Sequence, residues 1–174
     1  MTIGELRKNK KGFSVLEVTM ALGIITTGLM GVFSLVLQNL QVQTINKNYL
    51  VASMLAQEGL ELVRNVRDTN FLQNRTFSSG LLPDGANSTI TVDNDGPPNV
   101  NIQNVADMAA AVLYLDNTNK VFHHDSSGSS ATIYHRLITI VEHTDYLEVH
   151  SNVQWAERGR THNYEAVTNL YNWW

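Results

Sequence analysis

The chain has 174 residues, with 12 lysines and arginines, 16 aspartates and glutamates, and a formal net charge of −4. It contains no cysteine, which excludes disulfides, cysteine metal ligands and cysteine nucleophiles. The length fits one domain of ordinary size together with an anchoring element.

Basic residues are concentrated at the start of the chain. Residues 1–12 hold Arg7, Lys8, Lys10 and Lys11 against one acid, Glu5, which leaves 8 basic and 15 acidic residues, a net of −7, for the rest. Nucleic-acid binding needs clustered Lys and Arg, so the acidic body argues against direct binding of nucleic acid. Basic residues before an apolar segment stay in the cytoplasm, so we expect the N-terminus inside the cell and the remainder outside.

A long apolar segment follows these basic residues. From Phe13 to Leu37, 25 residues contain one charged side chain, that of Glu17. As a helix the segment would reach roughly 37 Å, more than the about 30 Å of a bilayer core. It is longer than the apolar region of a secretory signal peptide and is followed by no A-x-A-like site, so we expect the mature protein to keep it.

Glu17 stands out because an isolated ionised acid within a bilayer costs about 2.5–3.5 kcal/mol on insertion scales. One interpretation is that its carboxylate extends to the headgroups from a helix end, where the helix dipole favours negative charge. The other is that a positively charged partner neutralises it. The residue types alone leave both interpretations open.

The stretch from Lys10 to Val18, Lys-Lys-Gly-Phe-Ser-Val-Leu-Glu-Val, followed by an apolar helix, resembles the class III signal of type IV pilins and type II secretion pseudopilins. The resemblance implies that a prepilin peptidase cuts between Gly12 and Phe13 and methylates the new amine of Phe13. Glu17 then takes the fifth mature position, where the family's glutamate pairs with the terminal amine of a neighbouring subunit. The proline that major pilins carry further along is replaced here by Ser34, which favours a minor pilin or a minor pseudopilin.

The helix is predicted to continue beyond the membrane-length segment. Apolar residues recur at three- and four-residue spacing from Leu50 to Val66, with polar residues between them. We expect the helix to end near residues 68–70, with Gly59 as a weak point and with Glu58 and Glu61 close to Arg64. The apolar side of this helix must be buried, and we expect the chain's own sheet to pack against it.

Residues 70–110 are rich in Asn, Ser, Gly, Pro and Asp, and are predicted to form a loop with one strand, Ser88–Val92. Further strands are predicted at Val112–Leu115 and Val121–Phe122, around a turn, and at Thr132–Val141. The last two residues, Trp173 and Trp174, could cap the core or form an exposed contact, and we favour capping.

The clearest strand signal comes near the end of the chain, where apolar and polar residues alternate before the turn dipeptide Arg158-Gly159. A two-residue hairpin at this dipeptide matches the apolar faces of both strands. In this register the opposed pairs are Trp155 and His162, Val153 and Tyr164, Ser151 and Ala166, Val149 and Thr168, and Leu147 and Leu170.

The sequence offers little support for catalysis or metal binding. The six histidines are His123, His124, His135, His143, His150 and His162, and they lack metal-site spacing; the hairpin places His150 and His162 on opposite faces. Asp93-Asn94-Asp95-Gly96 copies the start of a calcium loop without its later ligands and is interpreted as a turn. No nucleophile elbow, phosphate-binding loop or dinucleotide fingerprint is present, so we predict no enzyme, no metal and no cofactor.

The predicted fold is α+β, with a long N-terminal helix whose C-terminal half packs on an antiparallel sheet, as in pilins. Its parts are a leader at 1–12, a membrane or filament-core helix at 13–37, an amphipathic continuation at 38–69, a loop-rich connection at 70–110 and a sheet head at 111–174. The resemblance implies a single-pass membrane protein with an extracytoplasmic C-terminal domain, which later joins a surface or periplasmic filament. Its implied partners are the prepilin peptidase, other pilin subunits, the membrane assembly platform and the lipid bilayer.

Two alternatives remain from the sequence alone. A signal-anchored extracytoplasmic sensor or ligand-binding domain would never polymerise and would keep residues 1–12. A membrane-tethered metal hydrolase would require bound zinc. Within the resembled family, the sequence does not separate a pilus from a secretion pseudopilus.

Overall fold

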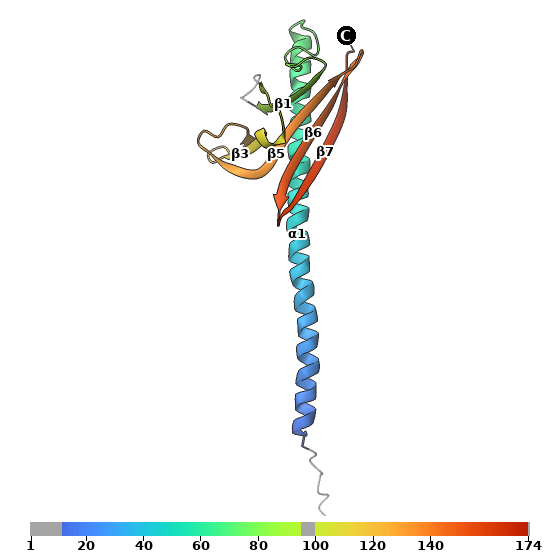
Figure 1. Cartoon of the computed structure of the whole chain (residues 1–174), viewed down its shortest axis with the longest axis vertical. Coiled ribbons are helices and arrows are strands. Elements are labelled where there is room, and N and C mark those ends of the chain that lie inside the picture. The colour runs from blue at the N-terminus through green and yellow to red at the C-terminus, as the bar shows by residue number, and fades with distance from the viewer. Residues whose placement is uncertain (1–11, 95–99, 174) are drawn as a thin grey trace, which may run out of the picture. The chain divides into compact units, whose positions relative to one another are not determined.

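A computed structural model describes residues 12–94 and 100–173 (Figure 1). The chain divides into two compact units, residues 1–46 and 47–174, which are treated in turn. One long helix, α1 (Val15–Leu72), contributes to both units. The predicted leader 1–12, apart from Gly12 itself, lies outside the described residues.

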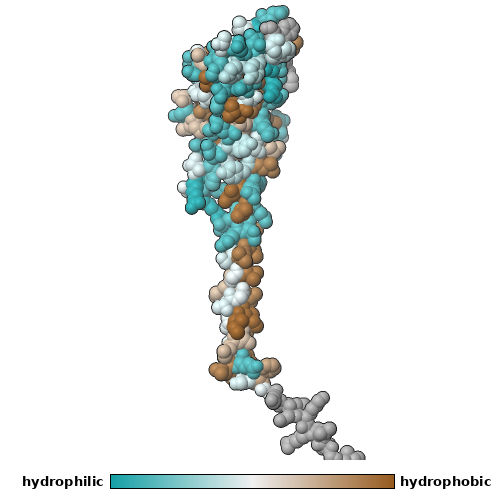
Figure 2. Space-filling view, turned by 90° about the vertical axis from the view of Figure 1, so that its right-hand side faces the viewer, coloured by the Kyte–Doolittle hydropathy of each residue, from teal (hydrophilic) through white to brown (hydrophobic). Residues whose placement is uncertain are grey.

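The described part of the first unit is almost entirely helical, and every side chain from Phe13 to Thr44 is exposed. This part of α1 is long and apolar enough to cross a membrane, and none of its most apolar 18-residue stretch is buried. Figure 2 shows these apolar side chains on the surface of the helix. The hydroxyls of Thr26 and Thr27 donate to the carbonyls of Leu22 and Gly23 at 2.9 and 2.8 Å, so these polar groups are satisfied without water.

The second unit packs α1 on one face of an antiparallel sheet of seven strands, counted over the described residues. The strands are β1 (Asn87–Asn94), β2 (Val100–Asn104), β3 (Val112–Asp116), β4 (Phe122–His123), β5 (Ser129–Glu142), β6 (Tyr146–Glu157) and β7 (Arg160–Tyr171), and a short 3-10 helix, η1 (Met108–Ala110), precedes β3. The predicted α+β fold is therefore confirmed.

The 14-residue strand β5 organises the sheet (Figure 1). Its first half pairs with β3 and its second half with β1 along one edge, while β6 occupies the opposite edge. β2 extends the sheet beyond β1, β4 beyond β3, and β7 beyond β6. The hairpin of β6 and β7 has the register expected from the sequence, with Trp155 opposite His162 and Leu147 opposite Leu170.

The expectations for residues 70–110 and for Trp173 were wrong. Residues 70–110 supply two strands, not one, and β1 pairs with the central strand β5, so this region belongs to the sheet. β2 was not predicted from the sequence because it is a short, polar edge strand with only two apolar residues. Trp173 does not cap the core: it is 65% exposed and lies 5.2 Å from the ring of Phe71, while Trp174 is outside the described residues.

The core consists of two apolar clusters between α1 and the sheet. One surrounds Val63 and joins it to β1, β5, β6 and β7, and the other surrounds Leu55 and Trp155. Between them, on the same inner faces of α1, β5 and β6, lie Gly59, Arg136 and Ser151. A buried polar layer thus interrupts an otherwise apolar interface.

Candidate functional site

The residues expected to carry the processing signal lie at the start of α1. Gly12 and Phe13 precede the helix, and the Phe13 side chain is 81% exposed. Ser14 caps the helix, because its hydroxyl oxygen accepts from the Leu16 amide at 3.3 Å and its carbonyl oxygen accepts from the Val18 amide at 3.2 Å. The helix therefore begins directly after the predicted cleavage point between Gly12 and Phe13.

Glu17 lies in the first turn of α1, and its side chain is exposed. A carboxylate there interacts favourably with the unpaired amides at the helix N-terminus. Within residues 12–94 and 100–173, no basic side chain forms an ion pair with Glu17.

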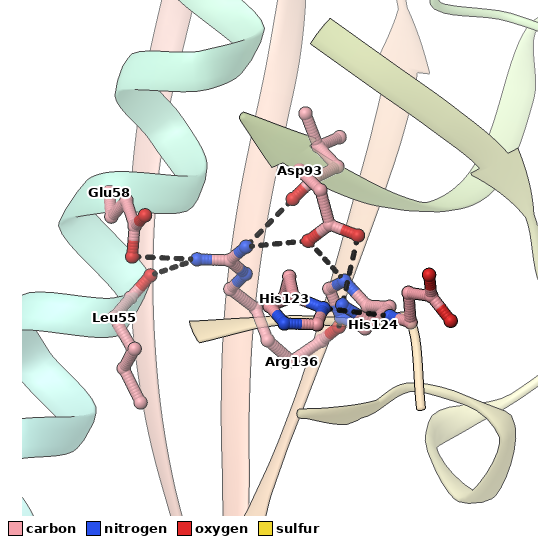
Figure 3. Close-up of polar contacts among 8 residues, drawn as sticks. Leu55, Glu58, Asp93, His123, His124 and Arg136 are labelled. Carbon is pink, nitrogen blue, oxygen red and sulfur yellow. Dashed lines mark hydrogen bonds and ion pairs between the residues drawn. The ribbon is translucent and has the colours of Figure 1, made fainter. Parts of the chain in front are cut away.

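A second polar site lies in the head, where Arg136 on the inner face of β5 is fully buried (Figure 3). Its Nη1 donates to the Leu55 carbonyl and to the Glu58 carboxylate, both at 3.2 Å. Its Nη2 donates to the Val92 carbonyl at 2.7 Å and lies 3.5 Å from Oδ1 of Asp93. One guanidinium thus ties α1 to β1 and β5, because its planar fork carries several donors in fixed directions.

Asp93 and His124 extend this site away from the helix (Figure 3). The His124 amide donates to Oδ2 of Asp93 at 2.9 Å, and its ring Nδ1 lies 2.6 Å from Oδ1. Burial raises the pKa of the Asp93 carboxyl, but the hydrogen bonds and charge of His124, with the charge of Arg136, outweigh it, so the net pKa is below the ordinary value. Asp93 is therefore held as a carboxylate.

Burial also lowers the pKa of Arg136, against the opposing charges of Glu58 and Asp93. An arginine starts from so high a value that its guanidinium remains charged. An intact buried ion pair contributes little net free energy to folding. Removing the arginine is costly all the same, because its buried partners are then left unpaired. Substitution of Arg136 should consequently lower the stability of the fold strongly.

Gly59 was predicted to be a weak point of the helix, but in the structure it lies in a close contact between α1 and the sheet. A Cβ built on Gly59 would lie 2.7 Å from Oγ of Ser151, 3.1 Å from Cδ1 of Ile138 and 3.2 Å from Cδ of Arg136. The missing side chain lets α1 approach β5 and β6 closely enough for Arg136 to reach the helix backbone. Of the two acids expected near Arg64, Glu61 pairs with it, whereas Glu58 pairs with Arg136.

Sequence analysis missed Arg136, although a signal for it was present. In the predicted strand Thr132–Val141, strict alternation puts Arg136 on the same face as Tyr134, Ile138 and Ile140. A charged residue at an inward position requires buried partners. The sequence could not identify them, because Glu58 and Asp93 come from a helix and a strand that are 78 and 43 residues away.

The other histidines are dispersed. His162 stacks on Trp155 with ring centroids 5.4 Å apart on the inner face, while His150 lies on the outer face, 3.0 Å from Glu165 and 3.3 Å from Glu148. Among the described residues, no group of three or more histidines, aspartates or glutamates is arranged to hold a metal ion. Asp93 and Asn94 are the last residues of β1, and Asp95 and Gly96, with which they are predicted to form a turn, lie outside the described residues.

Comparison with known proteins gave no match to any family model, any curated protein or any solved structure.

Proposed function

We propose that this chain is a minor pilin-like structural subunit of a type IV pilus or a type II secretion pseudopilus. The observation that carries the proposal is the start of α1. An exposed Phe13 follows Gly12 and lies just before α1, which has a single acid, Glu17, in its first turn and remains apolar and exposed for membrane length. Such a helix needs either lipid or other helices to cover it.

The proposed sequence of events follows from this chemistry. The chain inserts into the membrane with its basic start in the cytoplasm, and a prepilin peptidase removes residues 1–12. The new ammonium at Phe13 then offers a counter-charge to Glu17 of a neighbouring subunit, which sets the axial register between the two helices. The antiparallel sheet domain would face outward from the bundle of helices, and the protein would do no chemistry of its own.

The N-terminus of the mature chain tests this proposal. The full chain is expressed with a prepilin peptidase, recovered from membranes or sheared filaments, and examined by mass spectrometry. We expect a methylated Phe13 as the first residue. A chain that still begins at Met1 would contradict the proposal and favour the signal-anchored sensor or ligand-binding domain.

A processing variant supplies the matched control. Gly12→Leu should block cleavage and leave an uncut, membrane-held precursor, because the peptidase requires a small residue there. Gly31→Leu introduces the same side chain within α1, away from the cut, and should be processed normally. Normal cleavage of Gly12→Leu would count against the assignment.

A further inference from the structure

The His124 ring lies between two hydrogen-bond acceptors. Its side chain is only 4% exposed, its Nδ1 lies 2.6 Å from the Asp93 carboxylate, and its Nε2 lies 3.2 Å from the Arg136 carbonyl oxygen. A carboxylate and a carbonyl are both acceptors, so each ring nitrogen must donate. A neutral imidazole has one N–H and can donate to only one of them, whereas a doubly protonated ring can donate to both (Figure 3).

The charges around His124 come from three elements, counted over the described residues. Asp93 faces it from β1, and Arg136 faces it from β5 with its carbonyl and places its guanidinium against the same Asp93. Glu58 of α1 reaches the group only through Arg136. With His124 protonated, two cations alternate with two anions. With His124 neutral, the four groups carry a net charge of −1, and a nitrogen lone pair faces a carbonyl.

His124 also fastens a specific segment. It follows the two-residue strand β4 and begins the loop to β5, and the neighbouring turn at 117–120 is held locally by Asp116, whose carboxylate accepts from the Thr118 and Asn119 amides. Nε2 of His123 lies 3.0 Å from Oγ of Ser129, the first residue of β5. Among the side-chain contacts of residues 117–128 in the described chain, those of His124 reach β1.

We propose that His124, Asp93 and Arg136 form a pH-sensitive latch that holds segment 117–128 against β1 and β5 while His124 is doubly protonated. Loss of one proton removes one ring hydrogen bond, and the segment then opens locally. The closed arrangement holds one ring proton more than a neutral imidazole does, so lower pH favours the latch and higher pH weakens it. The inference is independent of filament assembly and applies equally to a monomeric anchored domain.

Hydrogen–deuterium exchange of the full chain in detergent tests the latch. After correction for the intrinsic pH dependence of exchange, protection of segment 117–128 should fall about tenfold between pH about 5.5 and about 8, the size of one hydrogen bond to a charged group. In His124→Gln, protection should be low and equal at both values. The control His143→Gln alters a half-exposed outer-face histidine and should retain the wild-type pH response.

A second readout separates the latch from a purely structural role. Nitrogen NMR of the histidine rings should show both His124 nitrogens protonated at the lower pH and one deprotonated at the higher, in step with the loss of protection. A neutral His124 at both values would overturn the proposal. An unchanged pH response in His124→Gln would also overturn it, and would mean that another group controls the segment.

Discussion

Gly59 of α1 faces Ser151 of β6 so closely that a Cβ at position 59 would lie 2.7 Å from the serine Oγ. Ser151 is itself fully buried, and its hydroxyl has no hydrogen-bond partner among the described residues. The contact lies beside Arg136, whose side chain bonds to the Leu55 carbonyl and the Glu58 carboxylate of α1.

Gly59→Ala should destabilise the head. Overpacking of a core costs about 1–3 kcal/mol, while replacing a helical glycine by alanine returns up to about 1 kcal/mol, so we expect a net loss in the free energy of unfolding. Urea unfolding of the full chain in detergent measures it. Adding Ser151→Ala removes the closest atom and should restore part of the loss; a double variant no more stable than Gly59→Ala would contradict this account.

Arg136→Met should cost about 3–5 kcal/mol in the free energy of unfolding, because it leaves the Asp93 carboxylate and the Val92 carbonyl buried without their cation. Arg136→Lys should recover little, since a single ammonium cannot reproduce the fork that reaches α1 and β1 together. Arg64→Met is the matched control: Arg64 is an exposed arginine of α1, paired at the surface with Glu61, and its loss should cost less than about 1 kcal/mol. Equal costs at the two positions would show that the buried network has no special role.

Asp93 should make the head sensitive to acid. Its pKa in the folded chain is lowered, with burial opposed and outweighed by His124 and Arg136, so the unfolded state binds more protons in the acid range. The stability that Asp93 contributes is present above the unfolded value of about 3.9 and is lost as pH falls through the lower folded value. Stability profiles against pH should be flatter on the acid side for Asp93→Asn than for wild type. Asp145→Asn, at an exposed position, should leave the acid limb unchanged.

Glu17→Ala should leave insertion and cleavage intact and lower incorporation into filaments, because the neighbouring ammonium would then enter an apolar bundle without a counter-charge. Quantitative immunoblotting of sheared filaments against membranes measures the ratio. Glu61→Ala removes an exposed carboxylate from the same helix in the head and should incorporate normally. Unchanged incorporation of Glu17→Ala would mean that this acid only resides at the membrane surface.

Arg158→Asn should stabilise the hairpin between β6 and β7. Arg158 and Gly159 both have positive φ, 52° and 76°, as a type I′ turn requires. A left-handed backbone conformation costs an ordinary residue about 1–2 kcal/mol, and asparagine tolerates it better. We therefore expect the free energy of unfolding, measured by thermal unfolding, to rise by about 0.5–1 kcal/mol. Gly159→Ala should have the opposite effect, and a gain there would argue against the turn type.

The hairpin shows what could be predicted from the sequence. Its register followed from alternation with period two and from a turn dipeptide that allows positive φ, both of which are local properties. The membrane-length helix was equally visible, because an uninterrupted apolar run with one acid has few other structures available. β2 was not visible, since a short polar edge strand is formed by pairing with β1 and carries no pattern of its own.

The amino-acid sequence by itself determined the apolar helix, the position of Glu17 five residues after Gly12, and the alternating strands of the sheet. Only the tertiary structure decided that Glu58 pairs with Arg136 and that position 59 has no room for a side chain. It alone also decided that Arg136 and His124 are buried. The physical reason is the range of each interaction. Periodicity and turn chemistry act between neighbours in the chain, whereas a buried charge is paired by whichever distant groups the packing of α1, β1 and β5 brings within hydrogen-bond distance.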